Sequence, residues 1–277
     1  MSGRPHTRLG CSTISFRHLD LDMALAWIMQ LGFRRIDLGA LPGVCDHVPY
    51  DLTPRAVASV ATTVRQSGLR VRSINADIGD LNRPLDAAGR AARDRHLDAL
   101  LDLAEAAGSP ALVLPCGALD HTPLRSLDED LDHVAGELIR AAERAADRDI
   151  QIWTESLHLH RLCCDIDRAQ ALTDRLSDSD VGIVMDFSHV VASGGDPLDF
   201  IARFGPRISH VHIRDAEPGN INLSVGRGRV DFAAGCKALA DSGYAGQFAL
   251  ELETRDITND QRPAATAAAA ALISDLI

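Results

Sequence analysis

Short apolar segments alternate with longer amphipathic segments about eight times along the chain. The short segments have the length of buried strands, and turn residues separate them from segments whose apolar residues recur at helical spacing. This alternation predicts repeated strand–helix units with parallel strands. The expected strands are Leu9–Thr13, Arg35–Leu38, Leu69–Asn75, Ala111–Leu114, Ile150–Thr154, Val181–Asp186, Ile208–Ile213 and Phe248–Glu251.

The amphipathic segments carry the sequence signals of helix ends. Thr53 and Asp196 each precede a proline, which combines an N-cap side chain with a residue suited to the first helical turn. Gly68 and Gly108 stand where two of these segments should end. The expected helices are Leu21–Leu31, Pro54–Ser67, Ala87–Ala107, Leu127–Asp147, Asp167–Leu176, Pro197–Phe204, Asp231–Ser242 and Pro263–Ile277.

Eight strand–helix units in 277 residues favour an α/β fold of the (β/α)₈ or TIM barrel type. In this fold a parallel eight-stranded barrel is surrounded by helices, and a chain of this length forms one domain, residues 1–277. An open, doubly wound sheet is the alternative. No linker-like tract rich in Ser, Gly or Pro divides the chain.

Composition narrows the classes of function. Hydrophobic residues make up 46% and charged residues 24%, and no apolar stretch approaches the roughly 18 residues of a membrane helix. The net charge of −11 makes nucleic acid a poor partner. The polar stretch Met1–Leu9 lacks the apolar run of a secretory signal, so we expect a cytoplasmic protein. The six scattered cysteines are expected to be reduced thiols.

Acidic and imidazole side chains end four successive predicted strands. Glu155, Asp186, His212 and Glu251 hold these positions, and in a barrel such ends converge on one mouth. A carboxylate at the end of a buried strand is costly unless it is paired or bound to a cation. We therefore predict one divalent metal ion, Mn²⁺ first, with Mg²⁺, Co²⁺ or Zn²⁺ as alternatives. A structural ion-pair network is the competing interpretation.

Further polar residues stand near the same predicted mouth. Asn75 closes the third strand, and His47 lies in the long loop 39–52. Each is a candidate substrate contact or a turn-forming residue. Arg227 belongs to the glycine-punctuated run 226–231, which we interpret as a loop that caps the following helix. Arg227 remains a candidate substrate contact at this loop.

Two polar residues near the same strand ends are not expected to belong to the site. We expect His210 to point toward the surrounding helices, because side chains alternate between the two faces of a strand. By the same reasoning, Glu253 is expected on the face opposite to Glu251.

Several short motifs follow one another at these strand ends. They are Leu9–Phe16, Leu31–Leu38, Glu155-x-x-His158, Asp186-x-x-His189, His210-x-His212-x-x-Asp215, Gly226–Phe232 and Gly243–Gly246, the last leading to Glu251. In this order the motifs resemble those of the xylose isomerase-like barrel superfamily, in its sugar phosphate isomerase/epimerase branch. The resemblance covers nearly the whole chain, and each motif alone is weak.

The resemblance implies roles for the strand-end residues. It makes Glu155, Asp186, His212 and Glu251 the metal ligands, in agreement with the choice made from strand ends. In the ketose epimerases of this family the two matching glutamates also move the substrate proton on opposite faces, while the metal stabilises the enediolate oxygens. We therefore predict a divalent-metal-dependent isomerase or epimerase of a sugar, keto-sugar or inositol-derived polyol.

The resemblance also suggests substrate contacts. His189 matches a donor to a substrate hydroxyl, and His158 occupies the corresponding place after Glu155. Both imidazoles are candidate acids for a dehydration. Asp215 is a further candidate contact, with capping of a turn or pairing with Arg214 as the alternative. Relatives of this family are often dimers or tetramers, so a homodimer or homotetramer is expected.

Three other functions remain open. A metal-dependent dehydratase of the inosose or dehydroshikimate type would use the same site and the same first proton abstraction. Phosphodiester cleavage, as in the abasic-site endonucleases, requires more histidines for a three-metal cluster, and this chain departs from that pattern. A sugar-binding barrel without catalysis is opposed by the presence of both Glu155 and Glu251.

Overall fold

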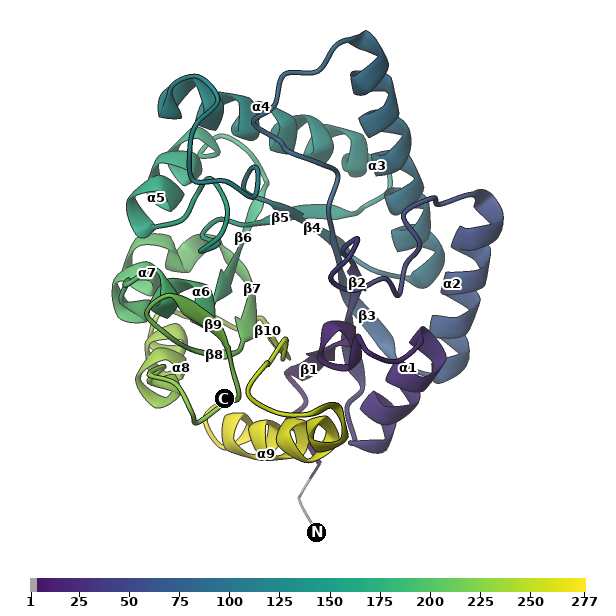
Figure 1. Cartoon of the computed structure of the whole chain (residues 1–277), viewed down its shortest axis with the longest axis vertical. Helices are drawn as coiled ribbons and strands as arrows, with labels where there is room; N and C mark the ends of the chain where they lie inside the picture. Colours follow the sequence, from purple (N-terminus) through teal and green to yellow (C-terminus); the bar gives the residue numbers. More distant parts are fainter. Residues whose placement is uncertain (1–3) are drawn as a thin grey trace.

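The computed structural model describes residues 4–277 and shows a closed barrel of eight parallel strands surrounded by helices (Figure 1). The barrel order is β1-β10-β7-β6-β5-β4-β3-β2. The predicted TIM barrel is thereby confirmed. The barrel strands are β1 (Leu9–Ser12), β2 (Arg35–Ala40), β3 (Arg70–Ala76), β4 (Ala111–Pro115), β5 (Gln151–Glu155), β6 (Gly182–Asp186), β7 (Ile208–Ile213) and β10 (Gln247–Leu250).

The helices of the outer layer begin and end close to the predicted positions. Thr53 caps α2, because its hydroxyl accepts a hydrogen bond from the Ala56 amide at 3.2 Å, and Gly68 ends α2 in the left-handed region at φ 72°. The helices are α1 (Leu21–Gln30), α2 (Pro54–Ser67), α3 (Ala87–Ala107), α4 (Leu127–Ala146), α5 (Ile166–Arg175), α6 (Phe187–Ala192), α7 (Pro197–Phe204), α8 (Phe232–Asp241) and α9 (Arg262–Ser274).

Several short elements close to the mouth were not predicted, including a helix and a hairpin. The short helix α6 begins immediately after β6, and Asp186 serves as its N-cap by accepting from the Ser188 amide at 2.6 Å. A hairpin of β8 (Asp215–Glu217) and β9 (Asn220–Leu223) follows β7 and lies beside α6. Both elements are too short for a hydrophobic period to develop, which is why the pattern along the chain missed them.

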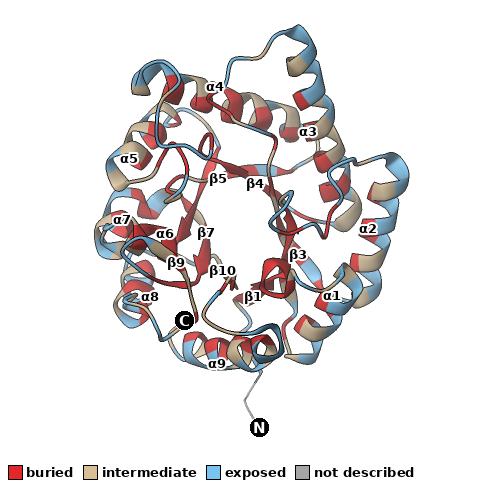
Figure 2. Cartoon of the chain, viewed as in Figure 1, coloured by how far each residue is buried: buried red, intermediate tan, exposed pale blue. Residues whose placement is uncertain are grey.

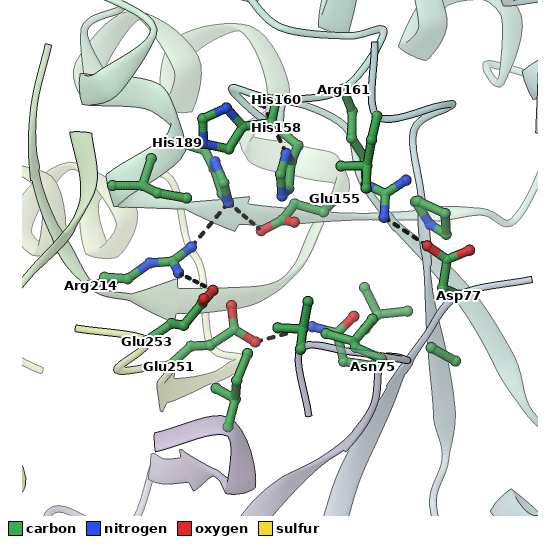
Figure 3. Close-up of a pocket in the computed structure, with 18 of the residues that line it drawn as sticks. Asn75, Asp77, Glu155, His158, His160, Arg161, His189, Arg214, Glu251 and Glu253 are labelled. Carbon is green, nitrogen blue, oxygen red and sulfur yellow. Dashed lines mark hydrogen bonds and ion pairs between the residues drawn. The ribbon is translucent and has the colours of Figure 1, made fainter. Parts of the chain in front are cut away.

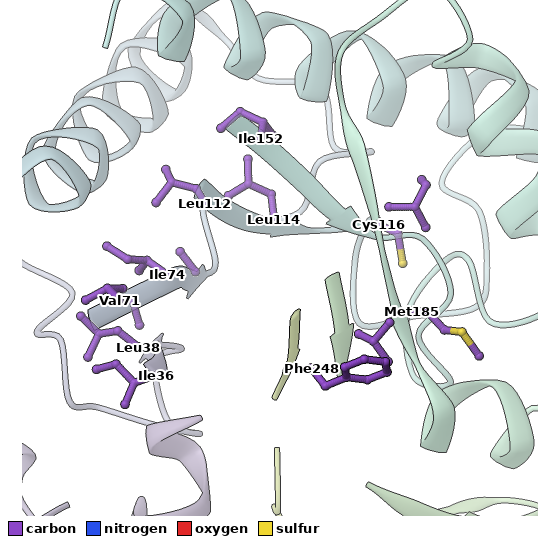
Figure 4. Close-up of a cluster of buried hydrophobic side chains, with 14 of the residues drawn as sticks. Ile36, Leu38, Val71, Ile74, Leu112, Leu114, Cys116, Ile152, Met185 and Phe248 are labelled. Atoms are coloured by element: carbon purple, nitrogen blue, oxygen red, sulfur yellow. The ribbon is translucent and has the colours of Figure 1, made fainter. Parts of the chain in front are cut away.

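The strands bury both of their faces, but against different neighbours. Their outward side chains pack against the helices as one continuous apolar layer (Figure 4), and buried residues follow the strands around the ring in Figure 2. The inward side chains include the small separate cluster of Ala111, Val113, Trp153 and Val184. The barrel interior is therefore a distinct layer that supports the mouth from below.

The stretch Met1–Leu9, in which no secretory signal is expected, is only partly described, since its first three residues lie outside the described range. Within residues 4–277, none of the helices combines the length and the apolar character needed to span a membrane.

The close packing of the barrel wall can be tested by a substitution at Gly182. A Cβ atom at this position would overlap Ser209 Oγ and lie 2.6 Å from Trp153 Cδ1. We expect Gly182→Ala to lower the free energy of unfolding by about 1–3 kcal/mol, because the buried wall must shift to accept the methyl group. Urea unfolding monitored by circular dichroism measures this change.

Gly136 in α4 provides the control, because a Cβ atom there meets nothing within 4 Å. Gly136→Ala should raise the free energy of unfolding by roughly 0.5–1 kcal/mol through helix propensity. An equal effect of both substitutions on the unfolding midpoint would contradict the packing argument.

Candidate active site

The four predicted metal ligands meet at one end of the barrel. Glu155 and Asp186 are the last residues of β5 and β6, His212 lies in β7, and Glu251 directly follows β10. One ligand atom from each of the four lies within 4.8 Å of the others. Glu155 Oε1 and His212 Nδ1 are buried without a hydrogen-bond partner of good geometry among residues 4–277. Such orphaned atoms fit a bound divalent cation.

The electrostatics of this cluster also favour a cation. Burial, with the charges of Asp186 and Glu251, raises the pKa of Glu155 to about 7. Burial would also raise the pKa of Glu251, but the nearby charge of His212 lowers it. Burial opposes the charged form of His212, yet the nearby carboxylates of Glu251, Asp37 and Glu155 raise its pKa well above 6.5. Glu155 and His212 thus favour their protonated forms, and a cation can replace those protons.

Below the ligands lies a carboxylate that sequence reasoning missed. Asp37 in β2 is fully buried, and its Oδ2 lies 2.7 Å from His210 Nε2 and 3.4 Å from His212 Nε2. This contact leaves Nδ1 of His212 facing Glu251 Oε2 at 3.3 Å. A carboxylate behind a metal-binding imidazole sets the tautomer and orientation of the ring. An acidic residue between two buried apolar residues of β2 was the available signal in the sequence.

The expectation that His210 points toward the helices is wrong. Side chains two residues apart share one face of a strand, so His210 and His212 both point into the barrel. The His210 ring stacks on Trp153 at a centroid distance of 5.6 Å, and the Arg72 guanidinium lies 4.4 Å from the Trp153 ring. These side chains fill the interior directly beneath the predicted ligands.

Above the ligands is a cavity of about 260 Å³, the size of a small-molecule site (Figure 3). Glu155 and Glu251 both line it. Asn75, a predicted substrate contact, also lines it and donates a hydrogen bond to Glu251 Oε1 at 3.0 Å. Apolar side chains of Ile14 and Val113 complete part of the wall.

The two predicted histidine contacts also reach the cavity. The rings of His158 and His189 lie 3.8 Å apart between centroids, at an interplanar angle of 31°. Burial, reinforced by nearby positive charge from residues including Arg214, lowers the pKa of both imidazoles well below 6.5. Both rings are therefore neutral at pH 7, which suits hydrogen-bond donation better than proton donation.

A buried arginine stands beside these histidines and was not predicted as part of the site. Arg214 directly follows β7 and donates to Asp186 Oδ2 at 3.0 Å and to Ser188 Oγ at 2.9 Å. It also approaches Glu253 Oε2 at 3.5 Å. Glu253 lines the cavity, so its expected position on the face opposite to Glu251 is wrong. Side chains two residues apart share one face of an extended segment, so Glu253 lies on the same side as Glu251, as His210 does with His212.

Three other predicted substrate contacts have partners away from the cavity. Asp215 accepts hydrogen bonds from backbone amides of the loop 226–230 and so holds that loop. The Arg227 side chain is 61% exposed and lies 3.4 Å from Asp256. His47 is buried, and its Nε2 donates to a backbone carbonyl at 3.0 Å. The structure does not bring these three to the cavity.

Comparisons with known proteins agree with this architecture. A family model described as "Xylose isomerase-like TIM barrel" matches residues 25–276. An inosose dehydratase of Lacticaseibacillus casei is 30% identical over 149 residues, which are 46% of this chain and 48% of that protein. The curated relatives that it matches align over less than half of their own length.

Solved structures show the same fold over almost the whole chain. The D-psicose 3-epimerase of Clostridium cellulolyticum H10, crystallised with D-tagatose, has a TM-score of 0.80 at 15% identity and covers 97% of this chain and 99% of its own. The IolI protein with a bound zinc atom has a TM-score of 0.78 at 16% identity, and the match covers 98% of this chain and 99% of the IolI chain.

The protonated state of the cluster predicts a pH-dependent metal affinity. Because the pKa of Glu155 is raised to about 7, this ligand carries a proton below pH 7 that a cation must displace. The affinity for Zn²⁺ or Mn²⁺ should therefore fall by up to about tenfold per displaced proton for each pH unit below 7. Calorimetric titration at pH 6 and pH 8, in two buffers of different ionisation enthalpy, measures affinity and proton release. Equal affinities at both pH values would contradict the prediction.

The carboxylate beneath His212 predicts a second effect on the metal. Asp37→Asn should lower the affinity for a divalent cation by roughly 10–100-fold, because the imidazole loses the partner that orients it. Asp94→Asn, which breaks a surface pair with Arg140 between α3 and α4, is the control and should bind metal like the wild type. Titration with the divalent cation measures the affinity of both variants, after circular dichroism has shown that each is folded. An unchanged affinity in Asp37→Asn rejects the orienting role.

Proposed function

Because the chain belongs to the xylose isomerase-like TIM barrel family, we propose that it is a divalent-metal-dependent isomerase or epimerase of a sugar, keto-sugar or inositol-derived polyol. One observation supports this most directly. Glu155 Oε1 and Glu251 Oε2 lie 3.7 Å and 3.3 Å from the same atom, His212 Nδ1, and both glutamates line one cavity. Two carboxylates that approach one substrate from different strands suit proton removal and proton return.

The two glutamates are held differently in the cavity. Glu251 accepts a hydrogen bond from Asn75 Nδ2 at 3.0 Å, whereas Glu155 Oε1 has no hydrogen-bond partner of good geometry among residues 4–277. In our proposal Glu251, held by Asn75, removes the proton beside the substrate carbonyl, and Glu155 returns a proton that it takes up from solvent. A bound divalent cation would supply stabilisation of the negative charge on the substrate oxygens.

We propose Mn²⁺ as the metal, because three carboxylates and one imidazole form an oxygen-rich ligand set. Zn²⁺ is the alternative, supported by the similarity in fold to the zinc-bound IolI protein. We further propose a small molecule as the partner, since the cavity of about 260 Å³ matches a compact ligand and the net charge of −11 opposes nucleic acid.

A dehydratase is the second candidate. It is favoured by the sequence similarity to proteins named inosose dehydratase. The same first proton abstraction would be followed by loss of a hydroxyl group, which requires an acid. Burial keeps His158 and His189 neutral at pH 7, so the glutamate that has taken the substrate proton is better suited to supply it to the leaving hydroxyl group.

The two candidates are separated by one experiment in D₂O. Metal-loaded protein is incubated with ketoses, keto-inositols and dehydroshikimate, and the products are followed by NMR. We expect deuterium at the carbon beside the carbonyl and no loss of water. Glu155→Gln and Glu251→Gln should each lower the exchange rate by at least roughly 100-fold, because each removes a proton-transfer group.

Glu143→Gln, an exposed substitution in α4, is the control and should exchange at the wild-type rate. A product that has lost water would replace the isomerase assignment by the dehydratase. Full exchange in both cavity variants would reject the proposed roles of the glutamates in either reaction.

A further inference from the structure

Arginine is concentrated at the end of the barrel remote from the cavity. Because the strands are parallel, the segments that begin them all lie at this end, which we call the base. The segments 4–8, 32–35 and 65–72, at the starts of β1, β2 and β3, contain no acidic residue. Their arginines, which we call the arginine half of the base, are Arg4, Arg8, Arg34, Arg35, Arg65, Arg70 and Arg72.

The arginine half is not neutralised within the chain. Arg8 and Arg34 donate to backbone carbonyls at 2.8 Å and 3.2 Å, and the buried Nε of Arg72 has no hydrogen-bond partner among residues 4–277. Arg35 and Arg70 are register partners on neighbouring strands, where like charges repel. Within the same described residues, no carboxylate forms an ion pair with any arginine of this half.

Another part of the base is acidic. Asp147 and Asp149 precede β5, and Asp178 and Asp180 precede β6. All four are exposed, and three of them line one hollow together with Glu143. We call these five residues the acidic half of the base. In the described part of the chain, none of them forms an ion pair.

The nearby surface shows that charges in this chain are usually matched. Three ion pairs join α3 to α4, namely Arg140–Asp94, Arg144–Asp98 and Arg148–Asp102. The last of them draws Arg148 away from the adjacent acidic half. Arg207, which begins near the same half, is held by backbone carbonyls at 2.7 Å and 2.8 Å. Unmatched charge is therefore a particular property of the base.

The two halves of the base lie across the barrel from each other. In the order of the ring, β4 separates their strands on one side, and β7 and β10 separate them on the other (Figure 1). A rotation of a second copy by half a turn, about an axis in the base between the halves, places its acidic half on the arginine half of the first. A polyanion would match the arginine half alone and would be repelled by the acidic half.

We propose that the base is an interface between two copies of this chain, in which the arginine half of each copy lies against the acidic half of the other. The two contacts are equivalent by symmetry, and each pairs charges that have no partner within one chain. The mouth of each barrel then faces away from the partner copy, so both cavities remain open. This arrangement is independent of the reaction proposed above.

Charge reversal at exposed positions tests the interface. Arg34→Glu with Arg70→Glu reverses charges of the arginine half, and Asp178→Arg with Asp180→Arg reverses charges of the acidic half. Sedimentation velocity at about 0.15 M salt should show a dimer for the wild type. Each double variant, folded by circular dichroism, should be monomeric, because like charges across the interface raise the dissociation constant by at least roughly 100-fold.

A mixture of the two double variants supplies the decisive comparison. In the mixed dimer the reversed charges of one copy meet the reversed charges of the other in both contacts, so attraction is restored. The equimolar mixture should therefore form a dimer although neither variant does so alone. Arg55→Glu with Arg95→Glu is the matched control, because it makes the same change in net charge at exposed positions of α2 and α3 and should leave the dimer intact.

Hydrogen–deuterium exchange of the wild type provides a test without any substitution. Amides in the segments 32–35, 67–70, 147–150 and 178–181 should exchange more slowly in concentrated protein than after dilution to the monomer. A monomeric wild type, a dimer that survives both reversals, or protection confined to other segments rejects the proposal. A mixture of folded variants that stays monomeric also rejects it. Heparin binding by a monomeric wild type would assign the arginine half to a polyanion instead.

Discussion

Three carboxylates buried at one barrel mouth repel one another, and the rest of the site is arranged around that repulsion. Glu155, Asp186 and Glu251 are brought together with His212 because parallel strands of a closed barrel all open onto one rim. Burial makes three adjacent negative charges unfavourable unless protons, a cation or donors neutralise them. The raised pKa values of Glu155 and His212 show protons in that role. A divalent cation would replace those protons.

Different neighbours neutralise each side of the cluster. Asp37 lies below His212 and fixes the direction of its ring, while Arg214 reaches Asp186 from the side. Asn75 donates to Glu251 from β3. The contacts of Asp37 and Asn75 join strands that are distant in sequence, so this part of the site depends on the closure of the barrel. The interior layer around Trp153 supports this arrangement from beneath.

The donor and acceptor groups of the cavity are unevenly distributed. Glu155, Glu251 and Glu253 provide acceptors, whereas His189 and Arg214 present N–H groups. This division suits a substrate in which a carbon acid lies next to an electron-poor oxygen, because the proton and the developing negative charge then meet opposite walls. Isomerisation and dehydration both begin with that step.

The sequence by itself determined the barrel, its strand positions to within a residue or two, and the four side chains that meet at the candidate metal site. Periodicity records which faces are buried, and strand ends of a parallel barrel converge whatever the details of packing. Only the tertiary structure decided which neighbours surround those ligands. Asp37, His210, Arg214 and Glu253 take part through contacts between separate strands, while Asp215 and Arg227 serve the loop 226–230 or the surface. Local patterns cannot specify these contacts, because partners far apart in the chain become neighbours only when the barrel closes.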